Sequence, residues 1–149
     1  MAFNNHYATF GHFPVGADSK PDPLVATTPH NFYRWSALAH ITPYLGEERA
    51  HDLIDFNTPM YRNTRLNPEV STAVATRLSI FLCPSDIEPF PVSDNGGTNY
   101  GLTNYVICAG TGNGGGTPFE TDGIFYVNSR TRIKDIIDGT SHTVLVSES

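Results

Sequence analysis

The chain has 149 residues, of which 39% are hydrophobic, enough for one domain with a single core but not for two domains. Charged residues make up 16% of the chain, and the formal net charge at pH 7 is −6. Because no basic stripe is present, nucleic acid and anionic membrane surfaces are excluded as partners.

The chain opens on a predicted helix, Ala2–Phe10, which is followed directly by Gly11. No capping residue precedes this helix, so it has the character of the last turns of a longer one. We expect that a segment upstream of Met1 has been removed. No apolar run approaches the roughly 20 residues that a membrane-spanning helix needs.

Proline and glycine then predict an irregular, extended segment over residues 11–29. Two short helices follow, divided at Pro43, because apolar residues recur near helical spacing from Trp35 onwards. We expect Thr42 to cap the second helix, with Pro43 in its first turn, where the missing amide hydrogen costs nothing. The buried face of that helix should be closed by Leu53, Ile54 and Phe56.

A further helix start is predicted at Asn67-Pro68-Glu69. Asn accepts an N-terminal amide bond, Pro presets the backbone angle, and Glu favours the positive end of the helix dipole. This helix should run to about Arg77. Residues 78–83 then predict a strand that ends at Pro84, and residues 104–109 predict a second strand.

Two turns, at 121–123 and 138–140, lead into the expected strands 124–127 and 143–146. Between the earlier and later strands, the glycine-rich residues 110–116 cannot hold regular structure. Helices come first and strands later, which predicts an α+β fold with helices packed on one face of an antiparallel sheet. The whole chain, 1–149, is then a single globular domain.

Several short motifs occur in a fixed order along nearly the whole chain. They are Phe3-Asn4-Asn5-His6-Tyr7, Gly11-His12-Phe13-Pro14, Trp35-Ser36, Pro43-Tyr44-Leu45, Phe81-Leu82-Cys83-Pro84-Ser85-Asp86, Asn104-Tyr105, Asp122-Gly123-Ile124-Phe125, and Ile136-Ile137-Asp138-Gly139-Thr140-Ser141-His142-Thr143. This ordered set resembles a large family of prepilin-like proteins, similar to type II secretion pseudopilins, that is abundant in planctomycetes and their relatives.

The resemblance implies a pilin-like head whose N-terminal anchor helix is truncated, with residues 1–10 as its remnant. Members of the family carry a prepilin cleavage signal and a long apolar helix ahead of the Asn-His-Tyr stretch. They also continue past the position of Glu148 into a box with a histidine and a later Asp-Gly, which this sequence lacks.

The function that the resemblance implies is a structural subunit of an envelope secretion or pilus-type filament. Its partners would be other pilin-like subunits or the secretion machinery, at the periplasmic or extracellular face of the cell envelope. The membrane would be contacted only through the missing N-terminal helix.

A solute-binding label has also been attached to the family, and aromatic residues give this chain a second interpretation as a secreted solute- or glycan-binding domain. Aromatic faces bind the apolar surfaces of sugars and anchor interfaces. The residues expected to form such a platform are Tyr33, Trp35, Tyr100 and Tyr105. Trp35 has the alternative role of filling the core.

No cofactor is required by the sequence, but the resemblance to secretion pseudopilins implies calcium in a loop beside the sheet. Calcium takes six to eight oxygen ligands. The candidate ligands are Asp94, Asn95, Glu120 and Asp122, which also suit turns. The histidines have no zinc-site spacing, although His6 and His12 could meet in space.

Two cysteines, Cys83 and Cys108, form a disulfide or remain two buried free thiols. A disulfide would restrict the unfolded chain by roughly 3 kcal/mol and would persist only in an oxidising compartment.

A small esterase or glycosidase is a third interpretation of the function. For an esterase, Asp138, Ser141 and His142 lie together, but they suit a turn better than a triad. For a glycosidase, Glu48, Asp52 and Asp55 share one helix face, where a solvated surface is the simpler account.

Overall fold

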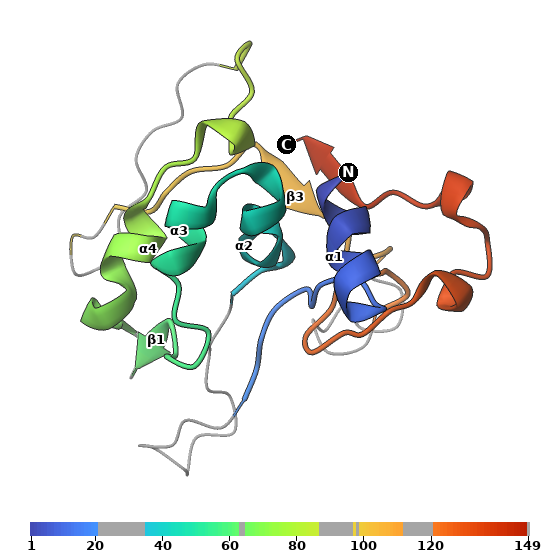
Figure 1. The fold of residues 1–149 in the computed structure, drawn as a ribbon, viewed down its shortest axis with the longest axis horizontal. Helices are drawn as coiled ribbons and strands as arrows, with labels where there is room; N and C mark the ends of the chain where they lie inside the picture. The colour runs from blue at the N-terminus through green and yellow to red at the C-terminus, as the bar shows by residue number, and fades with distance from the viewer. Residues whose placement is uncertain (21–34, 63–64, 87–96, 98, 112–120, 149) are drawn as a thin grey trace.

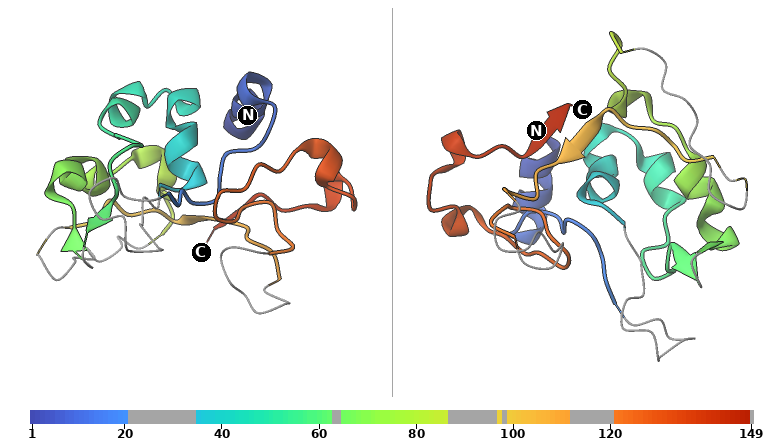
Figure 2. Two further views of the ribbon diagram at one scale, coloured as in Figure 1. Left: turned by 90° about the horizontal axis from the view of Figure 1, so that it is seen from below. Right: turned by 180° about the vertical axis from the view of Figure 1, so that it is seen from behind.

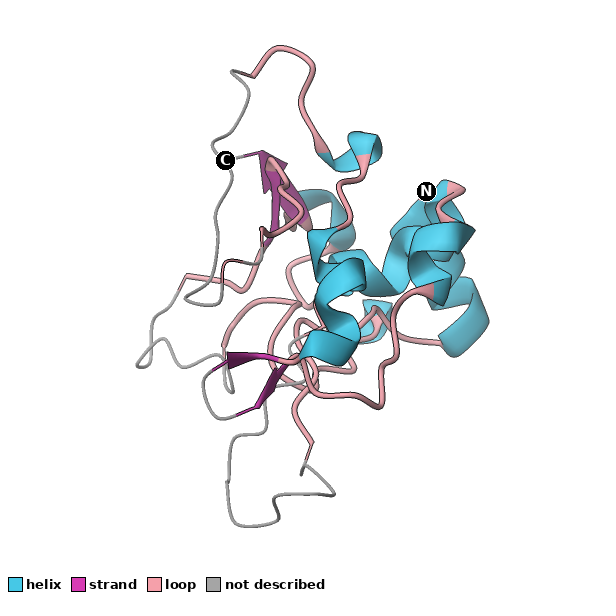
Figure 3. Ribbon diagram, turned by 90° about the vertical axis from the view of Figure 1, so that its left-hand side faces the viewer, coloured by secondary structure: helices cyan, strands magenta, loops and turns pink. Residues whose placement is uncertain are grey.

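The computed structural model describes residues 1–20, 35–62, 65–86, 97, 99–111 and 121–148. The fold is α+β, as predicted, with short helices and two small antiparallel sheets (Figure 3). No helix in these ranges has the length and apolar character needed to cross a membrane.

Four α-helices and five 3₁₀ helices (η) lie in the described ranges. The α-helices are α1 Ala2–Phe10, α2 Ala37–Ile41, α3 Glu48–Asp52 and α4 Ser71–Ala75. The 3₁₀ helices are η1 Thr42–Leu45, η2 Pro68–Val70, η3 Ser79–Phe81, η4 Ile133–Asp135 and η5 Thr140–His142.

Each sheet within those ranges is a pair of short antiparallel strands. Strand β1, Tyr61–Arg62, pairs with β2, Arg65–Leu66. Strand β3, Tyr105–Ile107, pairs with β4, Val146–Glu148, with Val106 opposite Ser147. The second pair brings the end of the chain beside its middle (Figure 1).

The predicted strands were mostly misplaced. Residues 78–83 contain η3 instead of a strand, and residues 124–127 contribute only an isolated bridge between Val127 and Ala17. The last strand begins at Val146, where the predicted strand 143–146 was expected to end. Apolar and β-branched residues favour a strand only beside a pairing partner. Among the described residues, η3 has one backbone bond of the kind that joins strands, from Asn104 N to Phe81 O at 2.9 Å.

The predicted helix ends were more successful. Gly11 ends α1 with φ 75°, and its N–H donates to Tyr7 O at 2.7 Å. Asn67 caps η2 as expected, because its Oδ1 accepts from Glu69 N at 3.1 Å. These ends rest on contacts within a few residues of sequence, which a local reading can anticipate.

Three details of the predicted helices were wrong. Thr42 has helical φ and ψ and donates its hydroxyl back to Ala39 O at 2.8 Å, because α2 runs straight into η1 and leaves no free end to cap. Leu53 is 46% exposed, whereas Ile54 and Phe56 pack inwards. Helix α4 ends at Ala75 because Thr76 is extended.

Two hydrophobic clusters form the interior. The first contains Phe13, Ala37, Ile124 and Phe125, and α1 packs against it. The second contains Trp35, Leu66 and Val70, between the helices of residues 37–75. Figure 2 shows α1 and the C-terminal residues 121–148 on one side of the molecule and helices α3 and α4 on the other. Helix α2 lies between the clusters.

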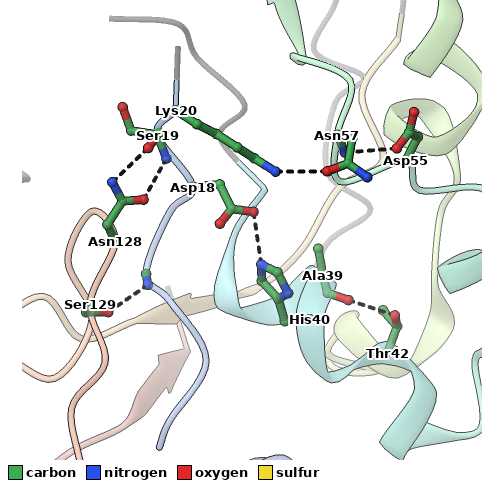
Figure 4. Close-up of polar contacts among 11 residues, drawn as sticks. Asp18, Ser19, Lys20, Ala39, His40, Thr42, Asp55, Asn57, Asn128 and Ser129 are labelled. Carbon is green, nitrogen blue, oxygen red and sulfur yellow. Dashed lines mark hydrogen bonds and ion pairs between the residues drawn. The ribbon is translucent and has the colours of Figure 1, made fainter. Parts of the chain in front are cut away.

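Residues 16–20 connect these two sides, and we call them the strap (Figure 4). On the C-terminal side, the N–H of Gly16 donates to Tyr126 O and to Ser129 Oγ, both at 3.0 Å. Asn128 clamps Ser19, since its Oδ1 accepts from Ser19 N and its Nδ2 donates to Ser19 O, at 2.9 and 2.7 Å. A Cβ on Gly16 would lie 2.5 Å from Tyr126 N, so only glycine fits this close backbone approach.

The strap also forms hydrogen bonds with the helical side of the molecule. The N–H of Asp18 donates to Trp35 O at 3.2 Å, and its carboxylate contacts His40 Nε2 at 3.2 Å. Farther along, Lys20 Nζ donates to Asn57 Oδ1 at 3.3 Å (Figure 4). The strap therefore ties both clusters to one short stretch of backbone.

Candidate functional site

A cavity of about 300 Å³ lies on the helical side of the molecule. Its walls come from α2, α3 and α4, from residues 54–61, and from two further segments, 76–81 and 100–103. The described residues that line it are Trp35, Ser36, Leu38, Ala39, Thr42, Ala50, Ile54, Met60, Tyr61, Ala73, Val74, Thr76, Leu78, Phe81, Tyr100, Gly101, Leu102 and Thr103. No residue of this set is ionisable near neutral pH, so the wall described here is uncharged.

Besides the hydroxyls of four Ser and Thr residues, this mostly apolar wall contains a tyrosine pair and a tryptophan. The hydroxyls of Tyr61 and Tyr100 form a hydrogen bond at 2.9 Å. Trp35 is 4% exposed, and its Nε1 is buried without an acceptor among the described residues. A buried donor that lacks an acceptor is costly and uncommon. The indole of Trp35 is therefore the unusual group in this wall.

Trp35 has an aromatic neighbour on the side of α3 and the strap. Its ring lies edge-on to Phe56, with ring centroids 6.0 Å apart. Phe56 in turn stacks on His40 at 4.4 Å, and His40 contacts the strap residue Asp18. The tryptophan thus has the packed core position that was one of its two expected roles, and it also borders the cavity.

The four aromatic residues expected to bind a ligand do not form one platform. Trp35 and Tyr100 both line the cavity. Tyr105 lies on β3, opposite Glu148 of β4, and is not part of that wall. Tyr33 lies outside the described residues. The structure therefore brings two of the predicted residues together at one mostly apolar cavity and separates a third from them.

Leu78, Phe81 and Leu102 are cavity residues that the sequence did not identify as a site. Hydrophobicity was the available signal, but for Leu78 and Phe81 it predicted a strand, which would have placed them in a sheet. Leu102 lay outside every predicted element. All three reach the cavity because segments 76–81 and 100–103 run alongside each other, as the bond from Asn104 N to Phe81 O shows.

A second distinctive surface is the docked face of α1. His6 is 5% exposed, and its Nδ1 lies 3.2 Å from His12 O. The rings of His6 and His12 are 5.9 Å apart, so the expected meeting of these two residues is confirmed. His6 also lies edge-on to Tyr44 of η1 at 6.0 Å.

Burial lowers the pKa of His6 from its ordinary value, because a charged ring would lose its hydration. The backbone bond to His12 opposes this effect, and the nearby rings of His40 and His12 add to it. The imidazole therefore favours its neutral form at this helix interface.

One family model matches the entire chain. Its description is "Protein of unknown function (DUF1559)", and it covers residues 1–149. The chain belongs to this family. No curated protein and no solved structure matches this DUF1559 chain. Both the cavity and the docked face of α1 lie within the residues that the family model covers.

Of the expected calcium ligands in this DUF1559 domain, the structure describes Asp122. Both carboxylate oxygens accept bonds from Thr111, from its N–H at 2.7 Å and from its hydroxyl at 2.6 Å. The Thr111 hydroxyl is the main cause of the lowered pKa of Asp122. Asp94, Asn95 and Glu120 lie outside the described residues, and the described ranges contain no group of three metal-ligating side chains. Calcium binding stays a prediction.

Cys83 and Cys108 are half-buried and free in the structure. Cys83 Sγ lies 3.1 Å from Ser85 Oγ, and Cys83 N donates to Asn104 Oδ1 at 2.8 Å. These bonds belong to the turn that follows η3. The disulfide between the two cysteines stays a prediction.

The residues of the esterase interpretation form a turn, as the simpler account expected. Gly139 has φ 84°, and its carbonyl accepts from the hydroxyl of Thr143 at 3.0 Å. Ser141 Oγ lies 3.3 Å from Nδ1 of its exposed neighbour His142. The contacts described for this turn include no hydrogen bond between His142 and Asp138.

The carboxylates of the glycosidase interpretation are exposed along and after α3. Asp55 accepts from Asn57 N at 2.8 Å and from the hydroxyl of Thr58 at 2.6 Å, and these bonds lower its pKa. A solvated face with a local turn is consistent with all of these contacts.

Proposed function

We propose that this DUF1559 chain is the head of a pseudopilin-like subunit, which assembles in an envelope secretion or pilus-type filament. The observation that carries the proposal is the way α1 is attached. The helix is fixed to the head along one face, on which Ala2 and His6 are buried, while Met1, the residue that precedes the helix, is exposed.

Two aromatic residues of α1, Phe3 and Tyr7, contribute to the attachment. The ring of Phe3 lies 5.4 Å from that of Phe125, and the ring of Tyr7 lies 5.3 Å from that of Phe13. The hydroxyl of Tyr7 also accepts from Ile133 N at 3.3 Å. The interaction is mostly apolar, which suits a helix that keeps a fixed orientation on the head.

The start of α1 is open to extension. Preceding residues can continue the helix from Met1 without displacing a packed side chain, since Met1 is exposed. A long apolar segment there would anchor the subunit in a membrane or pack in a filament core, and the head would be displayed outwards. In this proposal the head works in the cell envelope, at its periplasmic or extracellular face.

The first test is the reading frame that encodes the chain. We expect it to specify, directly ahead of residue 1, an apolar helix of about 20 residues or more preceded by a prepilin processing signal. A reading frame that begins at Met1 after a stop codon, or that encodes a polar segment there, contradicts the proposal.

The second test is proximity of subunits in the cell that makes the protein. A photo-cross-linking amino acid at Asn5, which is exposed on α1, should yield a ladder of covalent self-adducts. The same group at Thr72, which is exposed on α4, is the matched control and should yield fewer adducts. Equal, monomer-only patterns from both positions would exclude α1 as an assembly surface.

A further inference from the structure

The cavity beside Trp35 has no part in the assembly proposal. We propose that it binds a small, uncharged and mostly apolar molecule with one hydrogen-bond acceptor, such as a ketone or an ester, and that the indole N–H of Trp35 is the donor. The cavity volume of about 300 Å³ is at the lower end of the range for small-molecule sites.

The wall determines the charge of the ligand. Its described residues include no acidic, basic or histidine side chain. A charged ligand would lose its hydration and would find no counter-charge there. An uncharged molecule meets no such penalty.

The same wall argues against a glycan. A sugar carries several hydroxyl groups, and each needs a hydrogen-bond partner when it leaves water. Leu78, Phe81, Leu102 and Val74 offer none from their side chains. The wall also carries hydroxyl groups, but those of Thr42, Tyr61, Thr76, Tyr100 and Thr103 already form hydrogen bonds within the chain. Sites of this kind orient a mostly apolar ligand through a small number of polar contacts.

The buried indole nitrogen of Trp35 determines which polar group the ligand should carry. Indole nitrogen is a donor only, and in Trp35 it is buried without an acceptor among the described residues. A carbonyl oxygen of the ligand would satisfy it. Because the nitrogen is fully buried, the ring has to shift against Phe56 and turn its nitrogen towards the cavity as the ligand enters.

Trp35 is the single tryptophan of the chain, so its indole N–H gives one resolved signal in a proton–nitrogen correlation spectrum. The probes are camphor, its hydrocarbon analogue bornane, and the anion camphorsulfonate, which share one carbon skeleton. We expect saturable binding of camphor, with a downfield shift of the indole proton. Bornane should bind about tenfold more weakly, the equivalent of one hydrogen bond, without the downfield shift. Camphorsulfonate should not bind.

Variants on α4 test the location. Ala73 lines the cavity, whereas Ala75 on the same helix is exposed and does not. Ala73→Leu should abolish the camphor response, and the matched control Ala75→Leu should keep it. Where Ala73→Leu loses the dispersed spectrum of a folded chain, Leu78→Phe fills the cavity from another wall and takes its place.

Trp35→Phe tests the hydrogen bond, with the backbone amide of Gly101 at the cavity wall as the signal. The variant should bind camphor and bornane equally. The proposal is wrong if camphor gives no saturable response or leaves the indole signal of Trp35 unmoved. It is also wrong if camphorsulfonate binds as well as camphor does. It is also overturned if Ala75→Leu and the cavity-filling variant behave alike, or if Trp35→Phe keeps the preference for camphor.

Discussion

His6 has the most unusual environment of any single side chain in α1. It is buried between α1 and η1, and its Nδ1 faces the carbonyl of His12. A carbonyl oxygen can only accept, so Nδ1 carries the hydrogen in this contact. Protonation would place a charge at a buried interface near His12 and His40, which accounts for the lowered pKa of His6.

This environment predicts a loss of stability in mildly acidic solution. The pKa of His6 is lower in the folded chain than in the unfolded chain, where it is about 6.5. As the pH falls through that value, the unfolded chain takes up the proton first, so the free energy of unfolding decreases. Urea denaturation at pH 7.5, 6.5 and 5.5 measures the decrease.

The matched comparison uses two histidines. His6→Asn keeps a donor near the position of Nδ1 but cannot titrate, so it should flatten the dependence between pH 7.5 and 5.5. His142→Asn, at an exposed position, should leave the dependence unchanged. Asp122 and Asp135 have lowered pKa values, so their contribution is present above about pH 4 and is lost only below it. An unaltered slope in His6→Asn would remove His6 as the cause.

Asn67 provides a second prediction at this scale. Its side chain is buried, caps η2 through Glu69 N, and donates to Pro59 O at 3.2 Å. Asn67→Ala leaves both partners without their bonds and should lower the free energy of unfolding by about 2 kcal/mol. Asn5→Ala, at an exposed site in α1, is the control and should change it by less than about 0.5 kcal/mol. Equal effects in the two variants would contradict a capping role.

At the scale of elements, local chemistry decided which predictions were confirmed. The cap at Asn67 and the left-handed glycines Gly11 and Gly139 depend on neighbours within a few residues, and the structure has all three. Strands depend on a partner that lies far away in the sequence. Residues 78–83 have the composition of a strand but no partner strand among the described residues, so a turn of 3₁₀ helix forms there instead.

The packing of α1 gives a prediction for an element. Phe125 is 1% exposed and contacts Phe3 of α1 and Phe13, with rings 5.4 and 6.5 Å apart. Phe125→Ala should lower the free energy of unfolding by about 3–5 kcal/mol and loosen α1 from the head. Ile137→Ala removes a 93% exposed side chain and should have little effect. Guanidine denaturation and hydrogen exchange of the α1 amides measure the two consequences. Protection of α1 that survives Phe125→Ala would contradict this attachment.

At the scale of the whole molecule, the strap explains how two hydrophobic clusters become one fold. It bonds to Tyr126 and Ser129 on one side and to Trp35 and His40 on the other. None of these contacts has a local signature in the sequence, which shows only proline and glycine nearby. The same limit applies to the cavity, where Trp35 and Tyr100 were predicted as ligand residues but the apolar walls were not, because they depend on the paths of two distant segments.

The strap predicts a loss of cooperative unfolding when it is disturbed. A Cβ at Gly16 would meet Tyr126 N at 2.5 Å, so Gly16→Ala should separate the strap from the C-terminal side. We expect a larger loss of stability than in Gly11→Ala, which has open space and should cost about 1 kcal/mol for its left-handed backbone. In Gly16→Ala, the tryptophan signal and the far-ultraviolet signal should no longer change together in urea. Coincident transitions would show that the strap does not couple the clusters.

The N-terminal segment contacts residues far along the chain, and these contacts determine when the segment can be buried during synthesis. Tyr7 and Gly16 bond to residues 126 and 113 positions later in the chain. During synthesis, residues 35–82 can therefore pack around Trp35 before Phe125 and Ile133, which contact α1, have been made. Helix α1 can meet Tyr44 of η1 early, but its docking is complete only after Phe125 and Ile133 have been made. Until then, part of its apolar face is available to chaperones or to a membrane.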